Sequence, residues 1–403
     1  VRDALLGIPS EDWDFATVAR PRDVQRVFRR TVPVGIDHGT VGVLDRDGTL
    51  HEVTTFRRDV ETDGRRAVVS FADRIEDDLA RRDFTINAIA WHPLREVLLD
   101  PFEGEADLAD RRLRTVGRPE ERFAEDYLRL LRALRFAGRF DLVIEEATWR
   151  ALRDGIDGLG GLSAERIREE WVKVMMGEDP SRALALYRES GALARVAPAL
   201  DDADASAWDE GVAWATALPP DDPTLRTVAV FEAIVPAGID AEERRARAEG
   251  VGGWMQGLRF SNAEIDRAVH LLATEPDPPP LGAPDSDVRR WLAAIGVPRV
   301  EDRFRLIEAR VSVGLADPDR SAWVARAREV LAAAPPLGVA DLAIGGRDLI
   351  REGFKPGPRF GEWLDALLEK VLDDPTLNTR DALLNEIDRL RSEEERGAGR
   401  EVP

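Results

Sequence analysis

Two aspartates near the start of the chain, Asp12 and Asp14, are the first residues whose spacing indicates chemistry. On an extended strand, residues i and i+2 point to the same face, so the two carboxylates would lie side by side. Adjacent carboxylates repel each other unless a cation lies between them, and their oxygens suit Mg²⁺. Two such ions can clamp a triphosphate during in-line nucleotidyl transfer. The Asp-x-Asp spacing by itself is also compatible with a surface turn or a helix cap.

Glu52 is a candidate third carboxylate for the same site. It lies in a predicted β-hairpin with strands over residues 38–44 and 49–56, which are joined by the strong turn signal Asp47-Gly48. In such a site, one ion would lower the pKa of an attacking 3′-hydroxyl, and the other would hold the leaving pyrophosphate.

A second cluster, Arg81-Arg82-Asp83, is followed closely by Asn87 and an apolar segment. An arginine can bind triphosphate oxygens through its two-pronged guanidinium, and an aspartate can accept a hydrogen bond from a ribose hydroxyl. The alternative interpretation is a salt-bridged helix start that leads into a core.

A third cluster lies in a helix predicted over residues 119–140. Asp126 and Arg129 are three residues apart, so they would be neighbours on one helix face. Arg132 and Arg135 continue the stripe at three-residue steps, while leucines hold the opposite side to a core. The alternative is a ladder of ion pairs on a solvated face.

The pair Asp126 and Arg129 has a chemistry that can select bases. A carboxylate beside a guanidinium places a hydrogen-bond acceptor next to a donor. Cytosine and adenine each offer an amino donor next to a ring-nitrogen acceptor, whereas guanine and uracil offer the reverse order. A fixed Asp/Arg pair should therefore accept C and A, because each mismatch leaves a buried polar group unpaired at a cost of about 1–3 kcal/mol.

The elements that must position these residues fall into two parts. Residues 1 to about 112 read as mixed α/β, with helices over residues 1–6 and 21–30, a short strand over residues 14–17, the hairpin, and a polar, mobile loop over residues 57–69. From about residue 113 onward the chain reads as almost entirely helical. Residues 276–284 carry five prolines and are predicted to form a linker or long loop, and the last helical region is expected to end near Leu390.

Composition narrows the class of protein. The 403 residues include 43% hydrophobic and 33% charged side chains, and no apolar run approaches the roughly 18 residues that span a bilayer. The absence of cysteine excludes disulfides, thiolate nucleophiles and cysteine metal sites, and it fits a cytoplasmic protein. The four histidines are scattered, which argues against a histidine-based metallohydrolase.

The net charge of −20 argues against general adhesion to nucleic acid, which depends on neutralising phosphates. A local arginine stripe can still bind phosphates while the rest of the surface repels them. Arginine far outnumbers lysine, and guanidinium suits bidentate phosphate contacts. A high-GC or salt-adapted proteome would explain the same overall bias.

Taken together, the clusters resemble the motifs of class II tRNA nucleotidyltransferases and bacterial poly(A) polymerases. The resemblance rests on several ordered segments that together touch both ends of the chain. They are Val1-Arg2-Asp3-x-Leu5-Leu6-Gly7 with Asp12-x-Asp14, Asp37 to Val41 with Glu52 to Arg57, Arg81-Arg82-Asp83-Phe84-Thr85-x-Asn87-Ala88, Glu125-Asp126-x-x-Arg129, Glu165-Arg166-Ile167-x-x-Glu170, and Asp348-Leu349-Ile350 with Gly353-x-x-Pro356-Gly357-Pro358-x-x-Gly361.

The resemblance implies an α+β protein with a polymerase-β-like nucleotidyltransferase head, a mixed sheet with helices, followed by an all-helical neck, body and tail. The implied domains are the catalytic head over residues 1–112, the neck that recognises the base over 113–180, the helical body over 181–275, and the helical tail that grips the tRNA elbow over 276–403. The family has a Gly-Gly pair just before the Val-Arg-Asp stretch. This chain begins at Val1, so we expect its natural start to lie upstream.

The resemblance also implies residue roles. Asp12 and Asp14 would bind two Mg²⁺ ions, with Glu52 as a further catalytic carboxylate. Asp126 and Arg129 would read the base, with Arg132 and Arg135 supporting the pocket or the phosphates. Other implied nucleotide contacts come from Arg2, Arg82, Asp83 and Asn87, and implied tRNA contacts in the tail come from Arg347, Lys355 and Arg359.

The implied activity is addition of CCA to tRNA 3′ ends from CTP and ATP, without a nucleic-acid template and without a membrane. Narrower relatives that add only CC, only the final A, or poly(A) remain open, because the motifs do not separate them. An inactive relative that binds tRNA as a chaperone is another alternative, but it would have no need for adjacent metal-ligand carboxylates. The sequence leaves the oligomeric state open.

Overall fold

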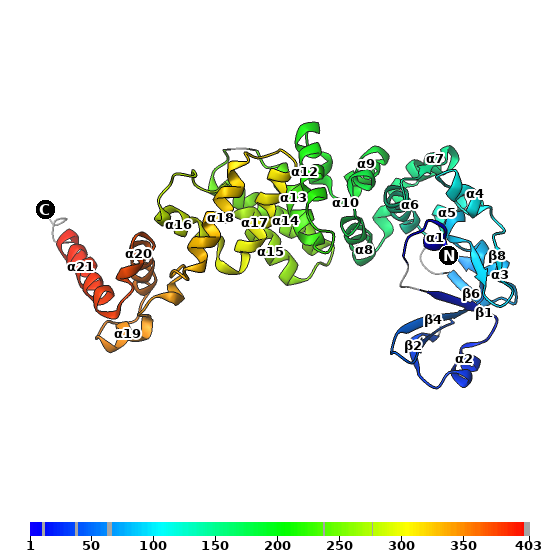
Figure 1. Cartoon of the computed structure of the whole chain (residues 1–403), viewed down its shortest axis with the longest axis horizontal. Helices are drawn as coiled ribbons and strands as arrows, with labels where there is room; N and C mark the ends of the chain where they lie inside the picture. Colours follow the sequence, from blue (N-terminus) through cyan, green and yellow to red (C-terminus); the bar gives the residue numbers. More distant parts are fainter. Residues whose placement is uncertain (10–12, 37–38, 63–66, 237, 276, 399–403) are drawn as a thin grey trace. The chain divides into compact units, whose positions relative to one another are not determined.

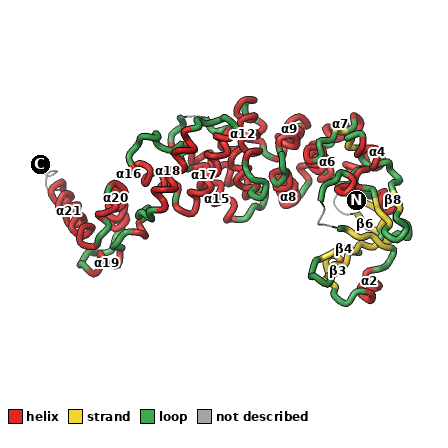
Figure 2. The backbone as a smooth tube through the Cα atoms, viewed as in Figure 1, coloured by secondary structure: helices red, strands yellow, loops and turns green. Residues whose placement is uncertain are grey.

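The chain forms two compact units, Val1–Asp202 and Ala203–Pro403. The computed structural model describes residues 1–9, 13–36, 39–62, 67–236, 238–275 and 277–398, and the side chains of these except 59–62, 67–69 and 392–398. Within the described residues, every strand lies in the first unit, and the second unit consists of helices and loops (Figure 2). The predicted α+β fold, with strands at the start and helices after them, is confirmed.

The main sheet of the first unit has four strands in the order β1-β4-β3-β2 (Figure 1). β1 pairs in parallel with β4, while β3 pairs antiparallel with both β4 and β2. Helix α2 covers one face of this sheet, where Val24 packs on Val41 and Val43. The strands are β1 (Asp14–Thr17), β2 (Thr31–Gly35), β3 (Thr40–Leu44) and β4 (Leu50–Thr55).

The short strand over residues 14–17 and the hairpin around Asp47-Gly48 are confirmed. The helix predicted over residues 21–30 ends earlier, at Val27, because Phe28 turns to an extended conformation and leads into β2. The loop predicted over residues 57–69 was wrong. It contains β5 (Arg57–Thr62), which pairs antiparallel with β6 (Ala67–Phe71).

The first unit continues with two further strand pairs and most of its helices. The pairs are β7 (Ala90–His92) with β8 (Val97–Leu99), and β9 (Arg112–Leu113) with β10 (Val143–Ile144). β10 is a two-residue exception to the all-helical neck. The helices are α1 (Arg2–Leu5), α2 (Pro21–Val27), α3 (Ile75–Ala80), α4 (Gly104–Ala109), α5 (Pro119–Glu125), α6 (Leu128–Arg139), α7 (Glu146–Asp154), α8 (Ala164–Met175), α9 (Ser181–Ser190), α10 (Ala192–Val196) and α11 (Pro198–Asp201).

The single helix predicted over residues 119–140 was also wrong, because it breaks into α5 and α6. Asp126 is extended, with φ −160° and ψ 103°, and its own carboxylate accepts a hydrogen bond from the Leu128 N–H at 3.1 Å. An aspartate side chain that bonds the backbone two residues on competes with the helix, which accounts for the break.

The second unit is built from ten α-helices within its described residues. Two buried clusters form its later part, one centred on Trp291, Phe304 and Trp323, and one on Leu349, Trp363 and Leu367. The helices are α12 (Ala205–Ala217), α13 (Pro223–Ala233), α14 (Ala241–Gly257), α15 (Asn262–Ala273), α16 (Asp285–Ile295), α17 (Val297–Ser312), α18 (Asp319–Ala332), α19 (Gly346–Arg351), α20 (Arg359–Asp373) and α21 (Arg380–Ala398).

Two sequence expectations for the second unit can be compared with these bounds. Residues 277–284 lie between α15 and α16 without regular structure, as the prolines predicted. The last helix continues to Ala398 and does not end near Leu390. No helix in the described part of the chain is both long and apolar enough to cross a bilayer.

A buried ion pair lies in the core of the second unit. The Arg303 guanidinium donates to the Glu232 carboxylate at 2.7 Å and 2.9 Å, and the two side chains are 1% and 5% exposed. The pair joins α17 to α13. A charge this deeply buried is tolerated only while its partner is present.

Replacing Arg303 by methionine should lower the free energy of unfolding by about 3–5 kcal/mol, because Glu232 would keep a buried charge without its partner. Urea denaturation followed by circular dichroism measures this loss. Arg299→Met is the matched control, since Arg299 lies on the same helix and pairs with the exposed Asp266. The control should lose less than about 1 kcal/mol. Equal losses would show that the buried pair has no special importance.

Candidate active site

Asp14 and Glu52 lie opposite each other on the parallel strands β1 and β4. Paired residues on neighbouring strands point to the same face, which here is the face that α2 does not cover. Both carboxylates are exposed, so a hydrated cation can reach them. Like charges directly opposite each other destabilise a sheet unless a cation lies between them, so the pair fits a magnesium site.

Asp12, the other predicted metal ligand, lies outside the described residues. Within the described residues, no group of three or more acidic or histidine side chains has the spacing of a metal site. Asp14 and Glu52 therefore supply two of the three predicted carboxylates.

Asp83 lies at the centre of a buried network that joins three distant segments. Its carboxylate accepts from Arg132 of α6 at 2.7 Å and 2.6 Å, from the Asn87 amide at 2.8 Å, and from the Phe84 N–H at 2.9 Å. Burial by itself would raise the pKa of Asp83. The charge of Arg132 and the hydrogen bonds outweigh burial and hold the pKa of this carboxyl below its ordinary value.

Arg2 joins the same network from the start of the chain. Its guanidinium donates to Asn87 Oδ1 and to Asp3, and it lies over the rings of Phe136 and Phe140 with centroid distances of 5.0 Å and 4.5 Å. Burial lowers the pKa of Arg2, and Asp3 only partly offsets this effect. The guanidinium is ion-paired with Asp3 at 2.6 Å, and its five N–H donors exceed the contacts to Asp3 and Asn87, so donors remain for an incoming anion.

Arg82 is the most accessible of the arginines predicted to contact nucleotide in the first unit. Its side chain is 39% exposed, and its contact with Asp78 is long, at 3.4 Å. Asp78 is buried and also accepts from the Arg57 N–H at 3.1 Å, just after β4. Asp78 thus connects the end of β4 to the segment that carries Arg82. Because its own contact with Asp78 is long, the Arg82 guanidinium keeps the capacity to bind a phosphate.

The predicted pair of Asp126 and Arg129 lies at the break between α5 and α6, not along one helix face. Asp126 is ion-paired with Arg166 of α8 at 2.7 Å. Tyr127 fixes the break, because its ring lies against Gly158, where an added Cβ would come within 2.2 Å of the ring. The acidic member of the predicted base-reading pair is therefore held by a separate helix.

Arg129 is held by different partners. Its guanidinium donates to Glu125 at 2.5 Å, to the Arg122 carbonyl at 2.8 Å and to the Arg81 carbonyl at 3.3 Å. Arg122 pairs with the same Glu125 at 2.9 Å and donates to the Ala80 carbonyl at 2.9 Å. Two arginines therefore tie the end of α3, and with it Arg82 and Asp83, to the break.

Arg135 is the least accessible of the arginines predicted to bind nucleotide, with a side chain that is 8% exposed. It donates to Glu170 of α8 at 2.6 Å. This placement fits the supporting role among the two that the sequence left open.

Sequence reasoning missed several residues that hold this site together. Arg122 was not singled out, and Phe136 and Phe140 were overlooked although their four-residue spacing places them on one helix face. Arg166 and Glu170 were noted only as part of a supporting helix. The Asp83 partner could not be predicted, because Arg132 is 49 residues away in the chain.

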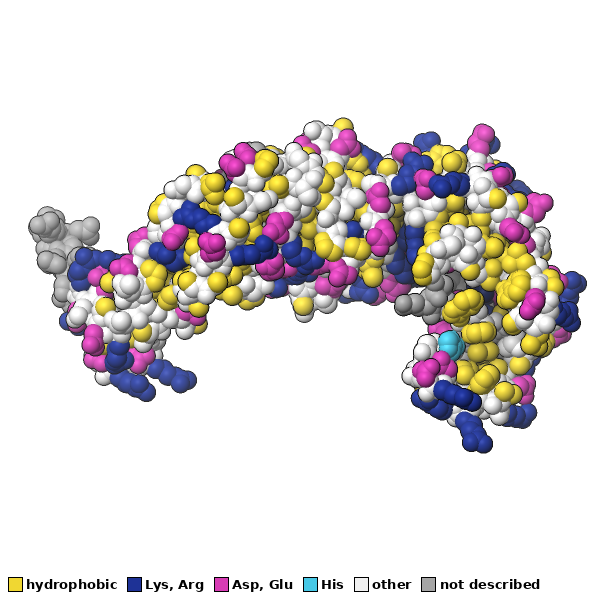
Figure 3. Space-filling view, viewed as in Figure 1, with side chains coloured by type: hydrophobic (Ala, Val, Ile, Leu, Met, Phe, Trp, Pro, Cys, Tyr) yellow, Lys and Arg dark blue, Asp and Glu magenta, His cyan; other side chains and the backbone are white. Residues whose placement is uncertain are grey.

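The three residues predicted to contact tRNA lie in the second unit, around α19 and α20. Arg347, Lys355 and Arg359 are all exposed. Lys and Arg side chains gather over the end of the second unit that carries these helices (Figure 3). An exposed basic cluster can bind phosphates on a protein that is acidic elsewhere.

Three family models match separate stretches of the chain. They are the Poly A polymerase head domain over residues 1–114, the "Probable RNA and SrmB- binding site of polymerase A" over residues 141–204, and a tRNA nucleotidyltransferase domain 2 over residues 337–387.

Whole-length relatives agree with these models. A CCA-adding enzyme of Latilactobacillus sakei subsp. sakei (strain 23K) is 34% identical over 95% of this chain and 91% of its own length. A CCA-adding enzyme of Geobacillus kaustophilus (strain HTA426) is 33% identical over 95% of this chain and 89% of its own length.

Solved structures share the fold. The crystal structure of the Bacillus stearothermophilus CCA-adding enzyme in complex with CTP has a TM-score of 0.75 at 30% identity and covers 98% of this chain and 92% of that one. The Thermotoga maritima CCA-adding enzyme complexed with tRNA is similar in fold, with a TM-score of 0.58 at 22% identity over 96% of this chain and 89% of that one.

Replacing Arg132 by methionine should make stability depend on pH in a defined direction. In the wild type, the low pKa of Asp83 stabilises the fold above the unfolded pKa of about 3.9, and this stabilisation is lost as the pH falls through the lower folded pKa. In the variant, burial without Arg132 would raise the pKa of Asp83 in the folded state above its unfolded value of about 3.9. The variant would therefore lose stability as the pH rises above this value. The gap between the two thermal midpoints should widen from about pH 4 to about pH 6.

Arg139→Met is the control for this titration, because Arg139 lies on the same helix with its guanidinium over Phe140. It should shift the thermal midpoint by the same amount at every pH. A constant gap for Arg132→Met as well would mean that Asp83 is not the group that titrates.

Proposed function

The chain belongs to the family of the CCA-adding enzymes, and on this premise we propose that it adds C, C and A to tRNA 3′ ends from CTP and ATP. The main support from the structure is one contact network. Arg2, Asn87, Asp83 and Arg132 come from three separate segments, were each expected to bind nucleotide, and meet around a single buried carboxylate.

The nucleotide's phosphates and sugar would lie beside this network. Arg82 is half-exposed and weakly paired, and Arg2 has N–H donors beyond those that bind Asp3 and Asn87, so both suit phosphate oxygens. Asp83 would accept from a ribose hydroxyl, and Asn87 would orient both Asp83 and Arg2. Arg132 keeps Asp83 ionised, which preserves its capacity to accept.

Base selection would require Asp126 and Arg129 to exchange partners. In this structure, Asp126 is held by Arg166 and Arg129 by Glu125. A cytosine or adenine edge would replace part of these contacts, because it offers a donor to Asp126 and an acceptor to Arg129. Guanine or uracil would place donor against donor, and the displaced ion-pair partners would add to the cost. The protein would thus act as the template.

Magnesium would be held by Asp14 and Glu52 together with Asp12. Two ions in such a site lower the pKa of the attacking 3′-hydroxyl and stabilise charge on the leaving pyrophosphate. The chain's own contribution is to hold the carboxylates on the open face of the sheet. β4 then leads into Arg57, whose N–H is bonded to Asp78 beside Arg82.

In the second unit, Arg347, Lys355 and Arg359 would bind tRNA phosphates.

Nucleotide incorporation tests this proposal. Three tRNA transcripts, ending before CCA, after CC and after CCA, would be incubated with Mg²⁺ and with CTP, ATP or both. We expect CC and then a single A, with no further addition. The Asp12→Ala, Asp14→Ala double variant, or removal of Mg²⁺ with a chelator, should lower the rate by at least about two orders of magnitude while tRNA still binds.

Other outcomes would replace the proposal with a narrower one. CC alone, A alone on the CC-ended transcript, or a long A tail would identify one of the narrower relatives. No incorporation on any transcript with retained tRNA binding would favour an inactive tRNA-binding protein. Full activity of the double variant would contradict the metal assignment.

Replacing Arg129 by alanine should relax base selection, because the donor that opposes guanine and uracil would be gone. Discrimination between CTP and UTP, measured as the ratio of their kcat/KM values, should fall by about 10- to 100-fold. Arg150→Ala is the control, since Arg150 pairs with Glu146 on the exposed face of α7. It should leave the ratio unchanged. An unchanged ratio for Arg129→Ala would mean that another residue reads the base.

A further inference from the structure

Asn87 depends for its position on a very short element. It is the last residue of the 3-10 helix Thr85–Asn87, which lies between the buried Phe84 and Ala88. Its amide donates to Asp83 and its carbonyl oxygen accepts from Arg2, so both contacts depend on the placement of this turn. A three-residue 3-10 helix has weak hydrogen-bond geometry, so contacts from outside must fix it.

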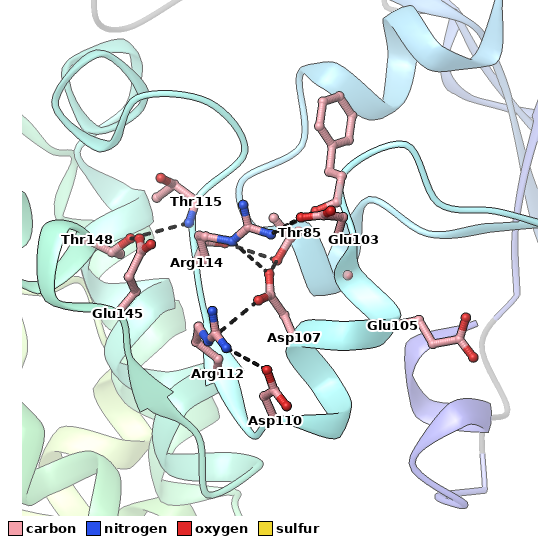
Figure 4. Close-up of polar contacts among 12 residues, drawn as sticks. Thr85, Glu103, Glu105, Asp107, Asp110, Arg112, Arg114, Thr115, Glu145 and Thr148 are labelled. Carbon is pink, nitrogen blue, oxygen red and sulfur yellow. Dashed lines mark hydrogen bonds and ion pairs between the residues drawn. The ribbon is translucent and has the colours of Figure 1, made fainter.

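Asp107 of α4 supplies that contact. Its carboxylate accepts from the Thr85 hydroxyl at 2.6 Å and from Arg114 Nε at 3.0 Å, and Arg112 lies 3.8 Å away (Figure 4). Asp107 is 2% exposed and Thr85 1% exposed. A hydrogen bond from a hydroxyl to a buried carboxylate is stronger than one between neutral groups.

Arg114 completes the connection through its backbone. The Thr85 N–H donates to the Arg114 carbonyl at 3.0 Å, and the Val116 N–H donates to the Asp83 carbonyl at 3.2 Å. The guanidinium of Arg114 donates to the Phe102 carbonyl at 3.1 Å, just before α4. The segment that carries Asp83 and Thr85 is therefore held along its backbone by residues 114–116.

The start of α4 also lies directly against the turn. An added Cβ on Gly104 would lie 2.2 Å from the Thr85 carbonyl oxygen, so only glycine allows this approach. Asp100 caps the same helix end by accepting from the Gly104 N–H at 2.8 Å. Thr85 is thus held at its hydroxyl, its N–H and its carbonyl side.

We propose that Asp107 and Thr85 are positioning residues for nucleotide binding, acting on the substrate only through Asn87. The Asp107 carboxylate holds Thr85, Thr85 sets the turn, and the turn presents Asn87 to Asp83 and Arg2. This inference rests on the proposed function, because it assigns the network to CTP and ATP. The resulting defect would lie in the binding of nucleotide and not in the chemical step, so it should raise KM with little change in kcat.

A double-mutant cycle tests this coupling. Thr85→Val removes the hydroxyl and keeps the shape, Asn87→Ala removes the amide, and a third variant carries both changes. We expect Thr85→Val to raise the KM for CTP on the order of tenfold. This is the size of effect expected when one hydrogen bond to a charged group is lost. In the Asn87→Ala background, the same change should add less than about twofold, because the amide that Thr85 positions is already gone.

Two further variants separate positioning from general stability. Thr85→Ser keeps the hydroxyl and should restore a KM within about threefold of the wild type. Thr148→Val is the matched control, because Thr148 is equally buried and its hydroxyl bonds Glu145 and the Thr115 N–H, on the other side of residues 114–116 (Figure 4). It should lower the thermal midpoint about as much as Thr85→Val without raising the KM.

The outcomes are distinguishable. Multiplying effects of Thr85→Val and Asn87→Ala, or an equal rise in KM for Thr148→Val, would overturn the inference while the proposed function stands. A wild-type protein that incorporates neither CTP nor ATP would instead contradict the proposed function.

Discussion

The ion pair between Asp83 and Arg132 is the constraint on which the rest of the first unit depends. Asp83 lies just after α3, and Arg132 lies in the middle of α6. A carboxylate at this depth stays ionised only because the guanidinium and two N–H donors surround it. The requirement for charge compensation therefore ties the segment that carries Asp83 to α6.

The same principle explains why the break between α5 and α6 is so heavily ion-paired. Under the proposed function, Asp126 and Arg129 would each meet a base, yet an unpaired and largely buried charge would be costly. Arg166 and Glu125 compensate each charge separately. Under the proposed function, a nucleotide would exchange one set of polar contacts for another, and selectivity would arise from the difference in free energy between the two sets.

The sequence predicted the fold class and the identity of the polar clusters, because motif residues lie close together in the chain. It also predicted β1 and the hairpin, where alternation and Asp47-Gly48 agree. The pairing of β5 with β6 was missed, because β5 is polar apart from one valine and lacks apolar alternation. The helix break was missed because periodicity cannot reveal a side chain that bonds its own backbone, as Asp126 does.

Partners distant in the chain could not be predicted at all, and they determine what each motif residue can do. Arg135 and Arg132 are three residues apart and have the same side chain. Arg135 is buried against Glu170, whereas Arg132 holds Asp83 beside the expected sugar site.

The net charge of the whole chain is equally uninformative about a single binding site. A chain with a charge of −20 still leaves Arg82 half-exposed, with only a long contact to Asp78, at the point where phosphates would arrive. Under the proposed function, affinity for the triphosphate would be set by the few guanidiniums that the fold leaves accessible, and the acidic remainder would limit binding to that place.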